Sequence, residues 1–280
     1  MQRLFPAFLA EPTDEQLLKD YAPPAGNHPF VRFNFVASID GAATHGGLSG
    51  GLGSPADKRV FSLLRRLADV ILVGAGTVRA EGYEGERLDA ADRAWRLRSG
   101  LPERPVLAIV SGRLDLDPDS ELFTQNPGEI LILTSATPDP VRAAALAQVA
   151  EVLRGPVPGT GESTAVDPQW IRSVLADRGH RMIHSEGGPR LLGAFQEADA
   201  IDSLCLTVAP LVAGGNAGRI SSGPDGSPLR PLGLQLLCEE GGNLLAEYRR
   251  PPRISDAEAA DSWRRPFAEP QVEDSRCLEQ

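Results

Sequence analysis

Short apolar runs, several of them separated by helical patterns, are the feature that most constrains the fold of this 280-residue chain. A short, almost continuously apolar run is typical of a strand that is buried on both faces of a sheet. Such runs lie at Asp69–Val73, Val106–Val110, Ile130–Leu133, Met182–His184 and Leu204–Val208. Helical patterns lie between several of them, at Pro140–Ala150, Trp170–Arg178 and Pro189–Ala198. This alternation predicts an α/β domain with a mostly parallel central sheet and helices on both of its faces.

The two ends of this pattern differ from its middle. Apolar and polar residues alternate over Val31–Phe35, which predicts a first strand with two unlike faces. Ser54-Pro55 has the composition of a helix start, with serine as the cap and proline at the first helical position. Near the end of the pattern, Leu234–Glu239 and Leu244–Arg249 flank a Gly-Gly turn and predict a hairpin. We therefore expect an antiparallel C-terminal hairpin at one edge of the sheet.

Proline content and periodicity divide the chain into three parts. Residues 1–28 hold several prolines and one short helical segment at Asp14–Asp20, and we interpret them as a surface arm. Residues 29–250 form the predicted α/β domain. Residues 251–280 are charged and contain proline but no apolar stripe, which predicts a surface tail.

Charge and cysteine content exclude several classes of function. The formal charge of −10 argues against nucleic acid as a partner, because phosphate backbones require a basic face. No apolar run is long enough to span a membrane, and the first residues do not form a signal peptide. Cys205, Cys238 and Cys277 form no C-x-x-C pair, and the four histidines have no metal-binding spacing. We expect a cytoplasmic protein without a metal, whose partner is a small-molecule substrate.

Two glycine-rich turns follow predicted strands. Gly74-Ala75-Gly76-Thr77 follows one apolar run, and Glu186-Gly187-Gly188-Pro189 follows another. Glycine lets a ligand approach the backbone closely, and free amides at a helix start suit a phosphate. Each turn alone could be no more than a compact junction between a strand and a helix. Two such turns in one domain favour a dinucleotide pyrophosphate, and Glu186 lies where ligands of open α/β sheets bind.

A glycine-rich loop follows the first predicted strand. Asp40 begins it, and Ala43–Gly53 has the composition of a flap over a ligand, or of a merely flexible loop. Ser49 lies in this loop, and Arg65 on the next helix carries a guanidinium suited to a phosphate, although a surface arginine is more often solvated. His184 lies inside an apolar run, and we interpret it as a packed residue rather than a catalyst.

Taken together, these motifs resemble the reductase domain of riboflavin biosynthesis, the C-terminal domain of the bacterial bifunctional deaminase–reductases. They are S-x-D-G at Ser38–Gly41, G-x-G-T-V-x-A at Gly74–Ala80, E-G-G-P at Glu186–Pro189, and the segment Ala209–Gly215. The resemblance covers residues from about 30 to 250 and implies a dihydrofolate-reductase-like fold. It also implies a stand-alone reductase of the actinobacterial type. Such an enzyme uses NADPH to reduce a pyrimidine ribosylamino phosphate, as 5-amino-6-(5-phosphoribosylamino)uracil reductases do.

The resemblance and the two turns together indicate the residues of a site. Substrate contacts are expected at Ser49, Arg65, Arg87 and Glu186. Cofactor contacts are expected at Ala37, Gly74, Gly76, Thr77, Glu81, Ser111, Thr134, Gly187, Gly188, Pro189, Arg190 and Leu191. Asp40 or Glu186 is expected to position or protonate the developing amine. A homodimer is also expected, paired through the hairpin edge near Leu234–Leu245.

The sequence departs from the family pattern in two respects. Many members have aspartate where this chain has Glu81, and the H-x-E and P-C-x-x-C signature of the zinc deaminases is absent, so no deamination is expected. The 2′-phosphate of NADPH is expected to find donors at Ser111–Arg113 and Thr134-Ser135. Two alternatives stay open: a dihydrofolate or other pteridine reductase on the same fold, and a non-catalytic NADPH-binding protein.

Overall fold

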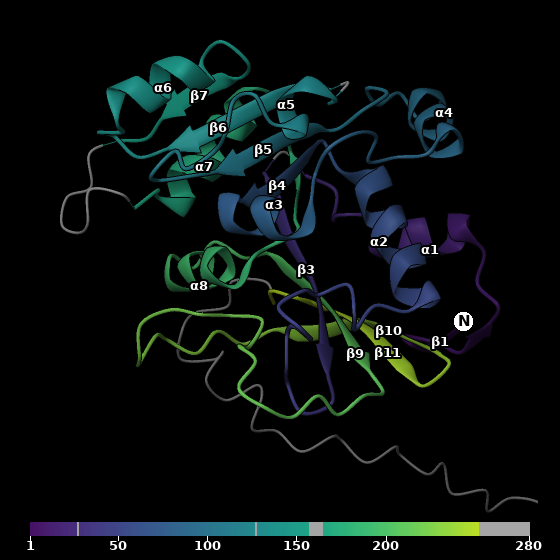
Figure 1. The fold of residues 1–280 in the computed structure, drawn as a ribbon. Helices are drawn as coiled ribbons and strands as arrows, with labels where there is room; N and C mark the ends of the chain where they lie inside the picture. The colour runs from purple at the N-terminus through teal and green to yellow at the C-terminus, as the bar shows by residue number, and fades with distance from the viewer. Residues whose placement is uncertain (27, 127, 157–164, 252–280) are drawn as a thin grey trace, which may run out of the picture.

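The computed structural model describes residues 1–26, 28–126, 128–156 and 165–251, and they form one eleven-stranded sheet with its helices (Figure 1). The strands are β1 (Gln2–Phe5), β2 (Leu9–Ala10), β3 (Phe30–Ser38), β4 (Val70–Gly74), β5 (Val106–Val110), β6 (Ile130–Thr134), β7 (Glu151–Arg154), β8 (Met182–Ser185), β9 (Ser203–Ala209), β10 (Gly233–Glu240) and β11 (Asn243–Arg249). The helices are α1 (Asp14–Tyr21), α2 (Pro55–Leu67), α3 (Ala75–Glu81), α4 (Ala90–Arg98), α5 (Glu121–Thr124), α6 (Pro140–Leu146), α7 (Pro168–Asp177) and α8 (Pro189–Glu197).

The centre of the sheet is parallel, as predicted. The strand order is β2-β1-β10-β11-β9-β3-β8-β4-β5-β6-β7, and every pair from β9 to β7 is parallel. The remaining pairs, from β2 to β9, are antiparallel. The predicted C-terminal hairpin is confirmed as β10 and β11, with Glu240 paired to Asn243 across the turn.

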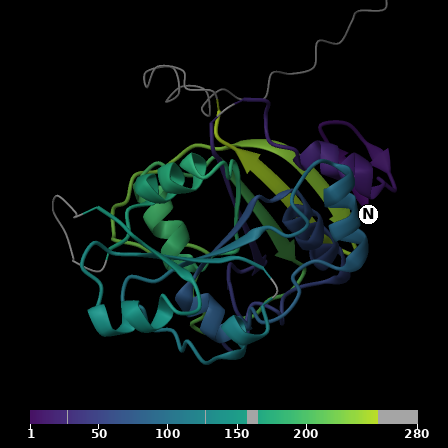
Figure 2. The same cartoon turned by 90° about the horizontal axis from the view of Figure 1, so that it is seen from above.

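Strand β4 illustrates how the apolar runs form the core. Val70 and Leu72 face α7 and α8, whereas Ile71 and Val73 face α3, α5 and α6. All four side chains are inaccessible to solvent. Burial of each stabilises the fold by roughly 1.5–3 kcal/mol. Helices therefore cover both faces of the sheet, as Figures 1 and 2 show.

The interpretation of residues 1–28 as a surface arm is wrong for most of this segment. Helix α1 begins with a capping box between Thr13 and Gln16. Its apolar side chains Leu17 and Leu18 are buried in a cluster with α2 and the antiparallel strands. Strand β1 pairs with β10, and Figure 2 shows the N-terminal segment beside this end of the sheet. The helix itself was predicted at Asp14–Asp20, but its burial and the strand β1 were not.

The hairpin lies on the antiparallel side of the sheet as predicted, but the exposed β10 edge expected for dimer pairing is absent, because β1 pairs with the outer side of β10. A buried ion pair ties the hairpin to the centre of the sheet. Arg32 on β3 donates to Glu247 on β11 at 3.0 Å, and neither side chain is accessible to solvent. The hydroxyl of Ser203 and the guanidinium of Arg249 also donate to Glu247. These donors satisfy the buried carboxylate oxygens, as buried charged groups in proteins generally require.

Several expectations concern the ends of the chain and its ligands. The predicted surface tail lies outside the described residues apart from Pro251, and so does Cys277. Within the described ranges, no helix is both long and apolar enough to cross a membrane. The same residues contain no group of three or more His, Cys, Asp or Glu side chains that could hold a metal ion.

Candidate functional site

The two glycine turns lie side by side at the carboxyl edge of the parallel strands. The amide of Gly74, at the end of β4, donates to the carbonyl of Gly187 at 2.8 Å. The amide of Glu186 donates to the carbonyl of Leu72 at 3.0 Å. Gly74 caps α3, and Gly188 caps α8 with Pro189 at its first position. The starts of two helices are thereby brought to one edge of the sheet.

The second turn requires glycine at both of its positions. Gly187 has a φ of +86°, and a Cβ there would lie 2.8 Å from the ring of Phe35. A Cβ on Gly188 would lie 2.5 Å from Oγ1 of Thr77. The peptide bond between Gly187 and Gly188 is cis. By contrast, a Cβ on Gly76 would meet no atom within 4 Å, so the surface of the first turn is open.

Glu186 is held by a three-bond clamp beside these turns. Nε and Nη2 of Arg65 donate to its two carboxylate oxygens at 2.6 and 2.8 Å. The hydroxyl of Tyr83 donates to Oε2 at 2.6 Å. The Glu186 side chain is only 2% exposed, and the guanidinium of Arg65 lies over the ring of Phe61 at 4.3 Å. The clamp therefore brings α2, the segment after α3 and the end of β8 together.

Burial and pairing act in opposite directions on the pKa of Glu186. Burial alone would raise it, but the charge and hydrogen bonds of Arg65 and the hydrogen bond from the Tyr83 hydroxyl hold the pKa below its usual value. Burial and the adjoining Glu186 raise the pKa of Tyr83 well above its usual value. Burial lowers the pKa of His184 to about 3, so its ring is neutral at neutral pH. The clamp is thus an ionised carboxylate with neutral tyrosine and histidine neighbours.

Asp40, the other expected acid, lies in a different setting. Its exposed carboxylate accepts hydrogen bonds from the Ser38 hydroxyl and from the amides of Ala213 and Gly214. These bonds, with the serine contributing most, lower the pKa of Asp40 to about 2. Asp40 thus joins the end of β3 to the segment after β9.

The expected substrate residues occupy several positions around the clamp. The amide of Ser49 donates to Oε1 of Glu81 at 2.9 Å, so these two residues of the site contact each other. Arg65 contacts Glu186 as described, and its Nη1 donates to the carbonyl of Arg87 at 3.2 Å. Nη2 of Arg87 donates to Asn126 at 2.9 Å. The arginines are therefore already held in place by protein groups.

Of the expected cofactor residues beyond the turns, most are buried, whereas Arg190 is exposed. Thr134 and Ser135 are buried, and their hydroxyls donate to the carbonyls of Ser111 and Gly112 at 2.8 and 3.3 Å. Leu191 packs in the core and Arg190 is exposed. Ala37 is buried near the end of β3.

Sequence reasoning missed Tyr83 and Asn126. Tyr83 follows Gly82, which ends α3 with a φ of +77°. The segment has no apolar periodicity, so no pattern distinguished this tyrosine from a surface residue. Its nearness in sequence to Glu81 was the one available signal.

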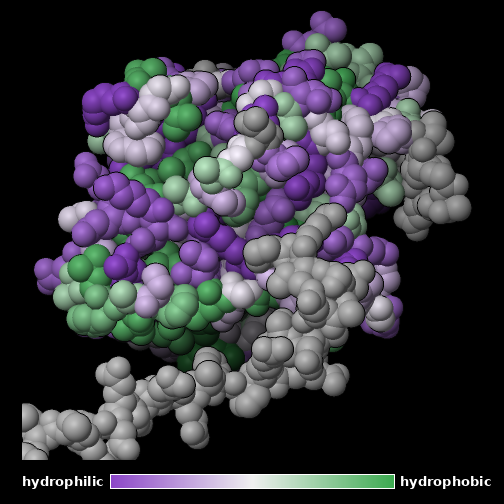
Figure 3. All heavy atoms as spheres, turned by 180° about the vertical axis from the view of Figure 1, so that it is seen from behind, coloured by the Kyte–Doolittle hydropathy of each residue, from purple (hydrophilic) through white to green (hydrophobic). Residues whose placement is uncertain are grey.

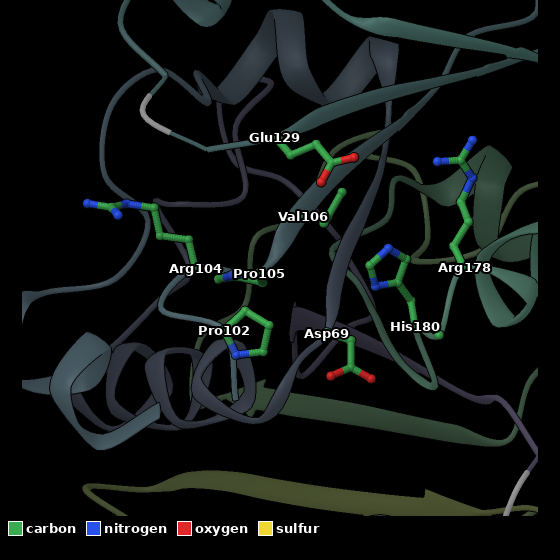
Figure 4. A pocket seen from close by; sticks show the side chains of 9 residues that line it. Asp69, Pro102, Arg104, Pro105, Val106, Glu129, Arg178 and His180 are labelled. Atoms are coloured by element: carbon green, nitrogen blue, oxygen red, sulfur yellow. The ribbon is translucent and has the colours of Figure 1, made fainter. Parts of the chain in front are cut away.

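A separate pocket of about 340 Å³ lies at the opposite edge of the sheet, near the amino ends of β4, β5, β6 and β8 (Figure 4). Its arginines already have acidic partners: Arg104 pairs with Glu86, and Arg178 pairs with Glu151. Ligands of open α/β sheets bind at the carboxyl edge instead. The clamp and the two turns are therefore the candidate site.

Comparisons with known proteins identify the family of the chain. The family model of the RibD C-terminal domain matches residues 29–240. The riboflavin biosynthesis protein RibD of Mycobacterium tuberculosis is 32% identical over 190 residues, which are 67% of this chain and 44% of that protein. The chain therefore spans less than half the length of that relative.

Two further relatives match over most of their own length. The 2,5-diamino-6-ribosylamino-4(3H)-pyrimidinone 5′-phosphate reductase of Methanothermobacter thermautotrophicus is 26% identical over 79% of this chain and 97% of that enzyme. The crystal structure of a pyrimidine reductase-like protein from Corynebacterium diphtheriae has a TM-score of 0.74 and 27% identity, covering 86% of this chain and all of that one. This chain belongs to the RibD C-terminal domain family.

Proposed function

We propose that this chain reduces a pyrimidine ribosylamino phosphate with NADPH, by hydride transfer to the sugar. The observation that carries the proposal is the position of the buried Glu186 carboxylate, next to two glycine turns at one sheet edge. The name of the Methanothermobacter relative, a reductase of such a phosphate, supports the substrate class.

The glycine turns fit the cofactor. A Cβ on Gly187 or Gly188 would collide with Phe35 or Thr77, so these glycines are required by the packing of the turn, whereas Gly76 borders open space where a ligand can approach the backbone. We assign the pyrophosphate to the starts of α3 and α8, where amides lack helical partners. When bound, the nicotinamide supplies the hydride, and the protein supplies orientation and electrostatics.

In this proposal, different residues contact different parts of the substrate. Glu186 stays ionised and accepts a hydrogen bond, so in this proposal it orients an N–H or O–H group of the substrate rather than giving a proton. Ser49 and Arg87 lie nearer the protein surface and are the groups we assign to the phosphate. Arg65 acts on the substrate through Glu186, because its fork already holds that carboxylate. The pKa of Asp40, about 2, favours a role in holding the loops.

The test is a comparison of substrates with NADPH saturating. We expect a higher kcat/KM for the aminouracil ribosyl phosphate than for dihydrofolate, followed by the loss of NADPH absorbance. Glu186→Gln should lower that value, whereas Glu84→Gln, at an exposed position after α3, should leave it unchanged. Faster turnover of dihydrofolate would replace this proposal with a pteridine reductase.

We also propose that the chain is a homodimer, paired through a sheet face rather than an edge. Phe5 and Leu244 are each 41% exposed, on the face of the antiparallel strands that turns away from α1 and α2. Leu237 pairs with Phe5 on this face. Figure 3 shows hydrophobic side chains gathered on one side of the rear surface. Exposed apolar groups of this kind favour contact with a partner.

A further inference from the structure

Tyr83 is the one member of the carboxylate clamp to which the proposed function gives no role. Its side chain is 8% exposed, and its ring packs in the core cluster that contains Val78 and Leu114. The hydroxyl is therefore fixed by core packing and not by a flexible surface chain. Its hydrogen bond to Oε2 of Glu186 is 2.6 Å long.

The clamp leaves the Glu186 carboxylate few free positions for accepting hydrogen bonds. An ionised carboxylate offers about four acceptor positions. Arg65 uses one on each oxygen, and Tyr83 uses the second on Oε2. One position remains, on Oε1, and the nearest imidazole nitrogen of His184 is 3.8 Å away, beyond hydrogen-bond distance. Glu186 can thus accept one hydrogen bond from a ligand through a single oxygen.

We propose that Tyr83 is a positioning residue of this reductase: its hydroxyl fixes the rotation of the Glu186 carboxylate and directs the open position of Oε1 to a hydrogen-bond donor of the substrate. The inference rests on the proposed function, since it assigns Glu186 to the substrate. Arg65 alone would still bind the carboxylate, but Tyr83 satisfies the second position on Oε2. A substrate donor is then left with Oε1.

Charged and titratable groups from every neighbouring segment act on this carboxylate. Arg65 lies on α2, His184 on β8, and Arg87 on the segment that also carries Tyr83. Glu81, at the end of α3, raises the pKa of Tyr83, whereas Arg65 lowers it. Loss of the Tyr83 hydroxyl leaves all four in place, so Tyr83→Phe isolates one hydrogen bond.

The first measurement needs no substrate. In protein labelled with ¹³C at the glutamate carboxyls, the Glu186 signal is assigned through Glu186→Gln and titrated with pH. Tyr83→Phe should raise the pKa of Glu186 by about one unit, the equivalent of one hydrogen bond to a charged group. Tyr21→Phe, at a buried tyrosine on α1, is the matched control and should leave the titration unchanged.

The second measurement is turnover. Tyr83→Phe should lower kcat by about tenfold and shift the acid limb of kcat/KM to higher pH, with the Kd for NADPH unchanged. In a Glu186→Gln background, Tyr83→Phe should lower kcat by almost nothing further. The assignment is overturned if a folded Tyr83→Phe variant has an unchanged Glu186 titration and kcat, or if it loses only NADPH affinity. It is also overturned if the losses in kcat from Tyr83→Phe and Glu186→Gln are fully additive. If the wild type fails to reduce the pyrimidine, the proposed function falls, while the carboxyl titration still decides whether Tyr83 controls Glu186.

Discussion

The amide of Ser49 donates a hydrogen bond to Oε1 of Glu81 at 2.9 Å, which joins the middle of the glycine-rich loop to the end of α3. Glu81 is exposed, so the bond lies at the surface of the site. Helix α3 starts at the first glycine turn, and the loop carries an expected substrate contact. The bond thus connects the two halves of the proposed site.

Glu81→Ala should free the loop. We expect the KM for the pyrimidine substrate to rise by about two- to tenfold, the effect of roughly 0.5–1.5 kcal/mol from one hydrogen bond. Limited proteolysis should cut the loop faster. Glu81→Asp should behave similarly, because the shorter side chain does not span the gap. Glu84→Ala is the matched control, and equal cleavage rates in all variants would contradict the connection.

Arg65→Ala should destabilise the fold as well as impair catalysis. Breaking a buried ion pair typically costs about 3–5 kcal/mol, because it leaves an uncompensated charge. Removal of both partners, in Arg65→Ala/Glu186→Ala, should restore part of this loss. Urea unfolding of the two variants and the wild type measures the difference.

The stability difference between wild type and Arg65→Ala should depend on pH in a defined direction. The pKa of Glu186 is lowered in the folded protein, so its contribution is present above the unfolded value of about 4.3 and is lost as the pH falls through the folded pKa. We expect the largest difference at neutral pH and a smaller one below about pH 4. A difference that grows with acidity would contradict the pairing.

The five strands predicted from continuous apolar runs match β4, β5, β6, β8 and β9 to within one residue at either end, because a strand buried on both faces needs such a run. The predicted first strand, Val31–Phe35, ends three residues before β3 does. Helix α4 and strand β7 were missed, since their patterns are polar. The short elements β1, β2 and α5 were missed as well, because two to four residues show no periodicity. The burial of α1 could not be read from its own residues. It depends on β10, more than 200 residues later in the chain.

The glycine turns were visible as motifs, whereas the clamp was not. Arg65 and Glu186 were expected to contact the substrate, and their contact with each other joins residues 121 positions apart. The Arg32–Glu247 pair spans 215 positions. No local pattern encodes which charges meet inside a folded sheet, so pairing of this kind emerges only from the topology.

NADPH should bind more tightly than NADH, and Arg113 is the residue we expect to distinguish them. Thr134 and Ser135 already donate to backbone carbonyls, so an exposed arginine after β5 is the better partner for a 2′-phosphate. Arg113→Ala should lower NADPH affinity about tenfold and leave NADH affinity unchanged. Arg98→Ala, at an exposed position on α4, is the control. Fluorescence titration with both cofactors is the measurement, and an equal loss for both would move the adenosine site elsewhere.

The homodimer is tested by light scattering. We expect twice the mass of the 29.8 kDa chain at micromolar concentration. Leu244→Glu should shift the protein toward the monomer, because a charge would enter the apolar face. Val141→Glu, at an exposed position on α6, should leave the mass unchanged. A wild-type monomer would overturn the proposal.

Gly188→Ala should abolish cofactor binding through the packing of the turn. The new Cβ would lie 2.5 Å from Oγ1 of Thr77, far closer than real atoms approach, so the turn or α3 must move. This movement should lower the Tm of Gly188→Ala. The double variant Thr77→Ala/Gly188→Ala lacks the blocking hydroxyl and should recover most of that decrease in Tm. Gly76→Ala, in helix α3, meets no atom within 4 Å and should not lower the Tm, yet should lower NADPH affinity if the cofactor approaches this backbone. Calorimetry and NADPH titration on the three variants separate folding from binding. Normal NADPH binding by a folded Gly188→Ala would show that the second turn does not hold the cofactor.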